Sequence, residues 1–191
     1  MNFHSTGMES KTCIFIIGTN GTGKTTLAKR IIESVGGGIL STTKEYTLLN
    51  NPKMAFVGSY DAAKKYGGVD GLNKTRVLRG IVEKLHASRP VVFCEGFFLN
   101  SFGDNLQNAM WVADNRYVVF LYASPAVINN RLYERSGRAV NESILTNQKA
   151  AFASALRWKK VGVKVVPINT GECTIEKELQ IVKEKILNGL L

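Results

Sequence analysis

The stretch that decides the fold is Gly18-Thr19-Asn20-Gly21-Thr22-Gly23-Lys24-Thr25, followed by Thr26. An apolar run ending at Ile17 precedes it and a run with helical periodicity follows, so it joins a predicted buried strand to a predicted helix. Glycines in such a turn let successive backbone N–H groups point inward around phosphate oxygens, at a helix N-terminus whose dipole favours anions. We therefore expect residues 18–26 to bind the phosphates of a nucleotide.

Lys24 and Thr25 complete the pattern G-x-x-x-x-G-K-[ST], known as the P-loop. A lysine at this position reaches the β- and γ-phosphates, and the hydroxyl of the next residue is placed for Mg²⁺. The sequence thus predicts ATP and Mg²⁺ as cofactors, with Thr25 as a metal ligand and Lys24 as a catalytic residue.

Apolar runs alternate with helical periods along the rest of the chain. The clearest further strands are residues 90–94, 117–122 and 163–168, with a shorter one at 39–41 and a brief apolar run at 54–57. Helices are expected near 25–35, 73–85, 106–112, 125–135 and 142–158, and after the N-cap Thr174. This alternation predicts the α/β class, with a mostly parallel sheet.

The domain organisation is simple. Residues 1–11 are polar and predict a mobile leader that is not a signal peptide, whereas residues 12–191 predict one domain without a linker or repeat. No apolar run reaches the roughly 20 residues that span a bilayer, so we expect a cytoplasmic protein with no membrane partner. The three cysteines have no metal-ligand spacing, and a structural metal is not expected.

The chain is strongly basic, with 25 Lys and Arg against 15 Asp and Glu, a net charge of +10 and a pI near 9.6. The excess is concentrated between residues 116 and 171, where nine basic residues face only two acids. These nine are Arg116, Arg131, Arg135, Arg138, Lys149, Arg157, Lys159, Lys160 and Lys164. Such a surplus suggests a polyanionic partner, DNA first, although a solvated basic surface would look the same.

Two carboxylates are candidates for chemistry beside the P-loop. Glu95 follows a strong strand, at the sheet edge where open α/β sheets bind ligands, and can hold the water shell of Mg²⁺ or act as a general base. Asp70 lies in the glycine-rich stretch 66–71 and is a candidate base or hydrogen-bond partner for the acceptor, unless it only shapes a turn. Tyr60 and Asp61, which lie just before this stretch, are weaker candidates for the same side of the acceptor site.

Arginines mark the expected lid. Arg131, Arg135 and Arg138 lie at i, i+4 and i+7 on and just past the helix that Ser124 and Pro125 begin. Guanidinium groups so placed can stabilise a transferring phosphoryl group and exclude water, which predicts a lid over residues 124–142 with Arg131 and Arg135 as catalytic residues. The alternative is a solvated basic stripe.

Taken together, these segments resemble the P-loop nucleotide and nucleic-acid kinases. More narrowly, residues 57–61, 67–71 and 92–96 (Val-Gly-Ser-Tyr-Asp, Gly-Gly-Val-Asp-Gly and Val-Phe-Cys-Glu-Gly) resemble the phage P-loop kinases that act on modified thymidines. The resemblance implies a three-layer α/β/α sandwich with a five-stranded parallel sheet of order 2-3-1-4-5. It also implies transfer of the γ-phosphate of ATP to 5-hydroxymethyl-deoxyuridine in DNA, a step toward thymidine hypermodification in a phage genome, with the base flipped out of a duplex.

Other functions stay open. The same fold suits a deoxynucleoside monophosphate or nucleoside kinase, or a polynucleotide 5′-end kinase. A DNA-binding P-loop ATPase without an acceptor is a further alternative, which the arginine-bearing helix and the absence of an apolar run ending in two acids disfavour.

Overall fold

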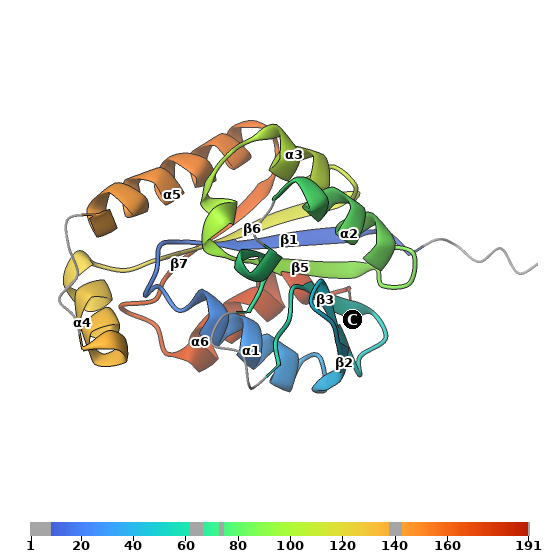
Figure 1. Cartoon of the computed structure of the whole chain (residues 1–191), viewed down its shortest axis with the longest axis horizontal. Helices are drawn as coiled ribbons and strands as arrows, with labels where there is room; N and C mark the ends of the chain where they lie inside the picture. Colours follow the sequence, from blue (N-terminus) through green and yellow to red (C-terminus); the bar gives the residue numbers. More distant parts are fainter. Residues whose placement is uncertain (1–8, 62–66, 73–74, 138–142, 191) are drawn as a thin grey trace, which may run out of the picture.

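A computed structural model describes residues 9–61, 67–72, 75–137 and 143–190. Figure 1 shows a central sheet with helices on both faces. Helices α2 (Leu78–Leu85), α3 (Asp104–Met110) and α5 (Ser143–Lys160) cover one face, whereas α1 (Lys24–Ser34) and α6 (Ile175–Val182) cover the other. The predicted α/β/α sandwich is therefore present in the described residues.

Five parallel strands form the centre of the sheet: β1 (Thr12–Ile17), β4 (Met54–Val57), β5 (Val91–Glu95), β6 (Asn115–Tyr122) and β7 (Lys164–Asn169). They lie in the order β4-β5-β1-β6-β7. Numbered along the chain, these five strands have the order 2-3-1-4-5 that the resemblance implies.

The predicted number of strands needs correction, because the sheet has seven. The two additional strands, β2 (Ile39–Thr42) and β3 (Tyr46–Leu49), pair antiparallel beside β4. Every residue of β2 is exposed, whereas every residue of β4 is buried. The run at 39–41 therefore lies at the edge of the sheet, and the apolar run at 54–57 takes the buried place beside β5.

Helix boundaries follow the predicted caps where the structure describes them. The Ser124 hydroxyl accepts a hydrogen bond from the Val127 N–H at 3.4 Å and caps α4 (Pro125–Ser136), and Thr174 caps α6 in the same way. The sequence predicts Asn73 as the N-cap of the helix expected near 73–85, and this residue lies outside the described ones; α2 begins at Leu78 after a short 3₁₀ turn.

Strand β1 holds the P-loop in place because it is completely buried between β5 and β6. In the register of β1 and β5, Ile16 lies opposite Glu95, so Glu95 ends its strand next to the start of the loop. At the other end of β1, the backbone N–H of Lys11 donates to Asp114 at 3.0 Å. Residues 1–8 of the predicted leader lie outside the described residues.

Within the described ranges, no helix combines the length and the apolar character that crossing a membrane requires.

Candidate active site

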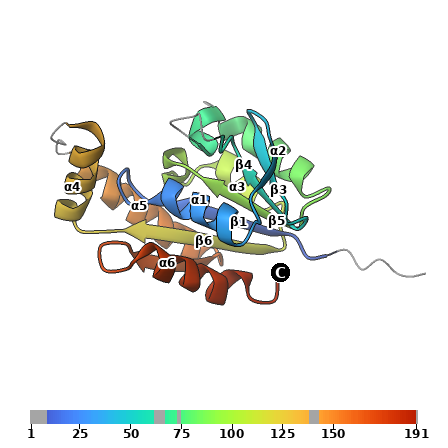
Figure 2. The same ribbon diagram turned by 90° about the horizontal axis from the view of Figure 1, so that it is seen from below.

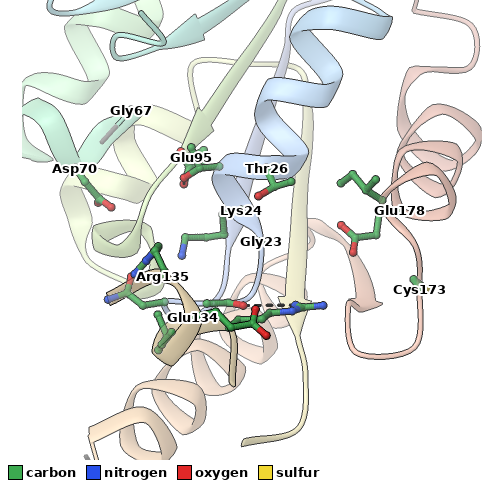
Figure 3. Close-up of a pocket in the computed structure, with 16 residues that line it drawn as sticks. Gly23, Lys24, Thr26, Gly67, Asp70, Glu95, Glu134, Arg135, Cys173 and Glu178 are labelled. Atoms are coloured by element: carbon green, nitrogen blue, oxygen red, sulfur yellow. Dashed lines mark hydrogen bonds between the residues drawn. The ribbon is translucent and has the colours of Figure 1, made fainter. Parts of the chain in front are cut away.

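A cavity of about 550 Å³ opens at the carboxyl ends of the parallel strands. It brings together most of the predicted site residues, from the P-loop, the end of β5, the loop before α2 and helix α4 (Figure 3). The lining residues are Asn20, Gly21, Gly23, Lys24, Thr25, Thr26, Gly67, Asp70, Glu95, Arg131, Leu132, Glu134, Arg135, Cys173, Ile175 and Glu178. The predicted residues Gly18, Thr19 and Thr22 are absent from this lining.

Buried polar contacts hold the P-loop in shape. The Asn100 side chain accepts from the Gly18 N–H at 2.8 Å and donates to the Gly18 carbonyl at 2.9 Å. A Cβ atom at Gly18 would lie 2.4 Å from the Leu121 carbonyl oxygen, so only glycine fits this turn. The Thr22 hydroxyl donates to the Thr19 carbonyl at 2.8 Å. The loop is therefore fixed from behind, leaving its front to the cavity.

Lys24 and the start of α1 form the anion-binding part of the site. The Lys24 ammonium donates to the Thr19 carbonyl at 3.1 Å, and the residue as a whole is only 6% exposed. Burial lowers the pKa of Lys24, while Glu95 and Asp70 act in the opposite direction. No side chain caps the N-terminus of α1 at Gly23, so the first N–H groups of this helix are available to a phosphate.

Glu95 lies at the centre of the site. One carboxylate oxygen accepts from the Thr25 hydroxyl at 3.0 Å and the other from the Tyr60 hydroxyl at 3.1 Å, with the side chain almost fully buried. Burial raises the pKa of Glu95, against the opposing effects of Lys24 and the two hydroxyls. Hydroxyl and carboxylate oxygens are the ligands that Mg²⁺ prefers, so Thr25 and Glu95 fit the predicted metal.

Asp70 has a structural contact as well as a place in the cavity. Its two carboxylate oxygens accept from the backbone N–H groups of Phe97 and Phe98, at 2.8 and 3.1 Å, at the start of the 3₁₀ turn Phe97–Asn100. Gly96 permits this approach, because a Cβ there would lie 2.6 Å from an Asp70 oxygen. The carboxylate lines the cavity on the same side as Glu95 (Figure 3).

The arginines of the expected lid have different surroundings. Arg131 donates to the Thr170 carbonyl at 2.6 Å and hydroxyl at 3.0 Å, and to the Gly21 carbonyl at 3.5 Å, so it joins α4 to the P-loop and to the loop after β7. Arg135 is exposed and lines the cavity, and its charge contributes to the lowered pKa of Lys24. Arg138 and the rest of the predicted lid, residues 138–142, lie outside the described residues.

The structure adds residues that the sequence did not single out. Asn100 fixes the first glycine of the P-loop, and Cys173, Ile175 and Glu178 form a wall of the cavity. The capped helix start at Thr174 was the one available signal for this wall, because it brings the first turns of α6 to the carboxyl end of the sheet.

The basic residues of the 116–171 region divide between the two ends of the sheet. Arg131 and Arg135 lie on α4, at the carboxyl end of β6 (Figure 2). Arg116 and Lys164 lie at the amino ends of β6 and β7. Arg157, Lys159 and Lys160 belong to the last turn of α5, which leads into β7. Much of the positive charge is therefore away from the cavity.

The comparisons with known proteins agree with this architecture. The model of the AAA_33 family, described as an AAA domain, matches residues 13–156, so the chain belongs to this family. No curated protein gives a significant match.

Several solved structures share the fold at low sequence identity. The YorR protein of Bacillus subtilis, solved with phosphorylated GDP, is 14% identical with a TM-score of 0.57 over 93% of this chain and 97% of that one. A gluconokinase from Sinorhizobium meliloti 1021 is 19% identical, with a TM-score of 0.52 over 91% and 89%. A deoxyadenosine kinase from M. mycoides, solved with dCMP and dCDP, is 16% identical, with a TM-score of 0.51 over 93% of this chain and 99% of that one. The fold is thus that of P-loop kinases.

Proposed function

We propose that this protein is a kinase that transfers the γ-phosphate of ATP, with Mg²⁺, to a hydroxyl group of a small acceptor such as a nucleoside or a nucleoside monophosphate. The observation that carries the proposal is the position of Glu95, hydrogen-bonded to Thr25 of the P-loop and facing the same cavity as Lys24 and Asp70. A P-loop beside two carboxylates holds both the phosphate donor and groups that can receive a hydroxyl proton.

The residues divide the chemistry between them. Lys24 and the N-terminus of α1 hold the β- and γ-phosphates, and Arg135 lies where it can stabilise charge on the transferring group. Thr25 and Glu95 would hold Mg²⁺, the latter through its water shell, and the metal neutralises charge on the phosphates when bound. We assign Asp70 to the acceptor hydroxyl, because the hydrogen bond to Thr25 places Glu95 at the metal and leaves Asp70 as the other carboxylate on this side of the cavity.

In the transfer step, the acceptor oxygen forms a bond to the γ-phosphorus while the bond from that phosphorus to the β–γ bridging oxygen breaks. ADP leaves with the electrons of the broken bond, and the hydroxyl proton passes to the carboxylate of Asp70. The acceptor must then enter from the side of the cavity that Asp70 and Glu95 line.

Two observations support a small acceptor. The cavity of about 550 Å³ is in the range of small-molecule sites. The structural neighbours described as a sugar kinase, a gluconokinase and a deoxyadenosine kinase carry the names of kinases with small acceptors.

A kinase of 5-hydroxymethyl-deoxyuridine in DNA is the second candidate, which the net charge of +10 favours. The division of the basic residues between the two ends of the sheet weakens this support, since cations at the amino ends of β6 and β7 are far from a base held at the P-loop. A polynucleotide 5′-end kinase would need the same contacts between basic residues and the DNA backbone.

The experiment is transfer of labelled γ-phosphate from ATP to separate acceptors: deoxynucleosides, deoxynucleoside monophosphates, sugars, DNA containing 5-hydroxymethyluracil, and unmodified DNA ends. We expect label on a free nucleoside or nucleotide, and none with Lys24→Ala. Label only on DNA would establish the second candidate instead. Release of inorganic phosphate without any labelled acceptor would indicate an ATPase and overturn both.

A further inference from the structure

Glu178 carries a carboxyl group that no contact within the described part of the fold accounts for. It lies in the first turns of α6, its residue is only 5% exposed, and it lines the cavity. Figure 3 shows its carboxyl group directed into the cavity from the side opposite Asp70, with Lys24 between them. Within the described part of the chain, no hydrogen bond or ion pair involves this carboxyl group. Its oxygens open to the cavity, so a hydrogen-bond donor that enters there can replace water on this carboxyl group.

The surroundings of Glu178 disfavour the charged form of its carboxyl group. Its neighbours in the chain, Leu179 and Val182, belong to the apolar core between α6 and the sheet. Burial raises the pKa of Glu178 to about 7, and Arg131 only partly opposes this effect. A ligand that donates hydrogen bonds to this carboxylate would favour its charged form.

The position of the phosphates shows what lies next to Glu178. In-line transfer places the acceptor and the leaving nucleotide on opposite sides of the γ-phosphate. Asp70 and Glu95 line the acceptor side, so the nucleoside of the donor extends toward the other end of the cavity. That end is formed by Arg131, Cys173, Ile175 and Glu178.

We propose that the carboxylate of Glu178 forms hydrogen bonds with the base of the donor nucleotide and thereby selects guanine over adenine. This inference rests on the proposed function, because it takes the P-loop to hold a nucleoside triphosphate, and it changes the preferred donor from ATP to GTP. A carboxylate has two acceptor oxygens and no donor. The N1–H and N2–H groups of guanine form a matching pair of donors. Adenine offers one donor at N6 and an acceptor at N1, and the N1 acceptor is repelled by a carboxylate oxygen.

The selection depends on pH in a defined direction. A protonated carboxyl group has one donor and one acceptor, which complement N1 and N6 of adenine. Lower pH therefore favours adenine and higher pH favours guanine. The charged and titratable groups around Glu178 are Arg131, Glu134 and Arg135 on α4, Lys24 and Arg30 on α1, Glu176 on α6, and Cys173 before it. Arg30 pairs with Glu176 at 3.1 Å, and Arg131 is the cation whose charge opposes the effect of burial on the pKa of Glu178.

The test measures binding without any acceptor. Dissociation constants for GDP and ADP with Mg²⁺ are determined by calorimetry at pH 8 and pH 6 for the wild type and for Glu178→Gln. Glu176→Gln is the matched control, on the same helix but exposed and outside the cavity. We expect the wild type to bind GDP roughly ten- to a hundred-fold tighter than ADP at pH 8, with a smaller ratio at pH 6. In Glu178→Gln the ratio falls toward one, because an amide can pair with either base.

Equal binding of GDP and ADP by the wild type at pH 8 would overturn the inference, as would an equal weakening of both nucleotides in Glu178→Gln. A melting curve for each variant separates loss of fold from loss of selection. Selective binding of GDP without transfer to any acceptor would leave the inference standing while the proposed kinase function fails. Absence of binding by either nucleotide would overturn both.

Discussion

Glu95 and Glu178 are two buried glutamates that line one cavity, yet their surroundings differ. Glu95 ends a central strand and accepts hydrogen bonds from Thr25 and Tyr60, so its position is fixed before any ligand arrives. Glu178 lies on a helix at the rim, and only the field of Arg131 favours its charged form. A carboxylate that the protein has already satisfied can hold a metal in a precise place, whereas one without a partner gains most from a ligand.

Glu95 is assigned to catalysis and Glu178 to recognition of the nucleotide, so the two glutamates should respond differently to the same substitution. Glu95→Gln removes charge beside Thr25 and weakens both the Mg²⁺ site and charge stabilisation during transfer, and we expect kcat to fall about 10²- to 10³-fold with every donor. Glu178→Gln should act on kcat/KM for GTP more than for ATP. Steady-state kinetics with both donors over a range of Mg²⁺ concentrations measures the difference.

A loss in Glu178→Gln that is equal for the two donors, or a donor-dependent loss in Glu95→Gln, would reverse the assignment of the two residues. Added Mg²⁺ should recover part of the activity of Glu95→Gln and none of that lost in Glu178→Gln.

Asp70 extends the comparison to the acceptor side. Asp70→Asn keeps the size of the side chain and one acceptor oxygen for the N–H groups of Phe97 and Phe98 but cannot take a proton. We expect kcat/KM for the acceptor to fall about 10- to 100-fold, the size of a general-base contribution at its lower end, with nucleotide binding retained. The control is Asp104→Asn, an exposed aspartate at the start of α3.

If Asp70 only anchors the turn at Phe97–Asn100, Asp70→Asn will lower the melting temperature and the kinetic constants together. A fall in kcat/KM with an unchanged melting temperature requires direct action on the acceptor.

The two glutamates also differ in whether the sequence predicts their place in the site. Glu95 could be predicted because it directly follows a run of strand residues, and the end of a parallel strand next to a P-loop is a defined place in the fold. Glu178 could not, because the helical pattern of α6 gives only its apolar face, and whether a glutamate beside that face meets solvent or a cavity depends on how α6 packs against α1.

The same limit applies to the sheet. The resemblance implied the order of the five parallel strands, and a strand at 39–41 was predicted, whereas β3 and its antiparallel pairing with β2 were not, because a strand of four residues carries little apolar pattern. Asn100 was also beyond prediction, since its two hydrogen bonds to Gly18 join residues 82 positions apart.

Tyr60→Phe tests whether the hydroxyl contacts of Glu95 matter for its protonation. The Tyr60 hydroxyl donates to Glu95 and lowers its pKa, so removal of the hydroxyl should raise this pKa further. A higher pKa moves the acidic limb of the pH profile of kcat to higher pH, and we expect about a three- to ten-fold loss of kcat at pH 6 with a smaller loss at pH 8. The exposed Tyr133→Phe serves as control. A uniform loss across pH would mean that Tyr60 only packs against Phe56.

The smallest expected effect is the pH dependence of stability that Glu178 causes. Its pKa of about 7 in the fold is above the ordinary value of 4.5, so the native state binds more protons than the unfolded chain between these values. The free energy of unfolding should therefore fall as pH rises through this window. Relative to the wild type, Glu178→Gln should gain about 1–2 kcal/mol between pH 5 and pH 8, a figure reduced for screening by solvent at the cavity mouth. Urea denaturation at both pH values measures it.

Glu176 provides the opposite case on the same helix. The hydrogen bond to its own backbone N–H and the contact with Arg30 lower the pKa of this exposed carboxyl, so Glu176→Gln should not reproduce the gain at pH 8. If the two variants share one pH dependence, Glu178 is already satisfied in the native state, and its contrast with Glu95 fails. If they differ and GDP abolishes the difference, the ligand supplies the partner that Glu178 lacks, because a bound guanine holds the carboxylate in its charged form.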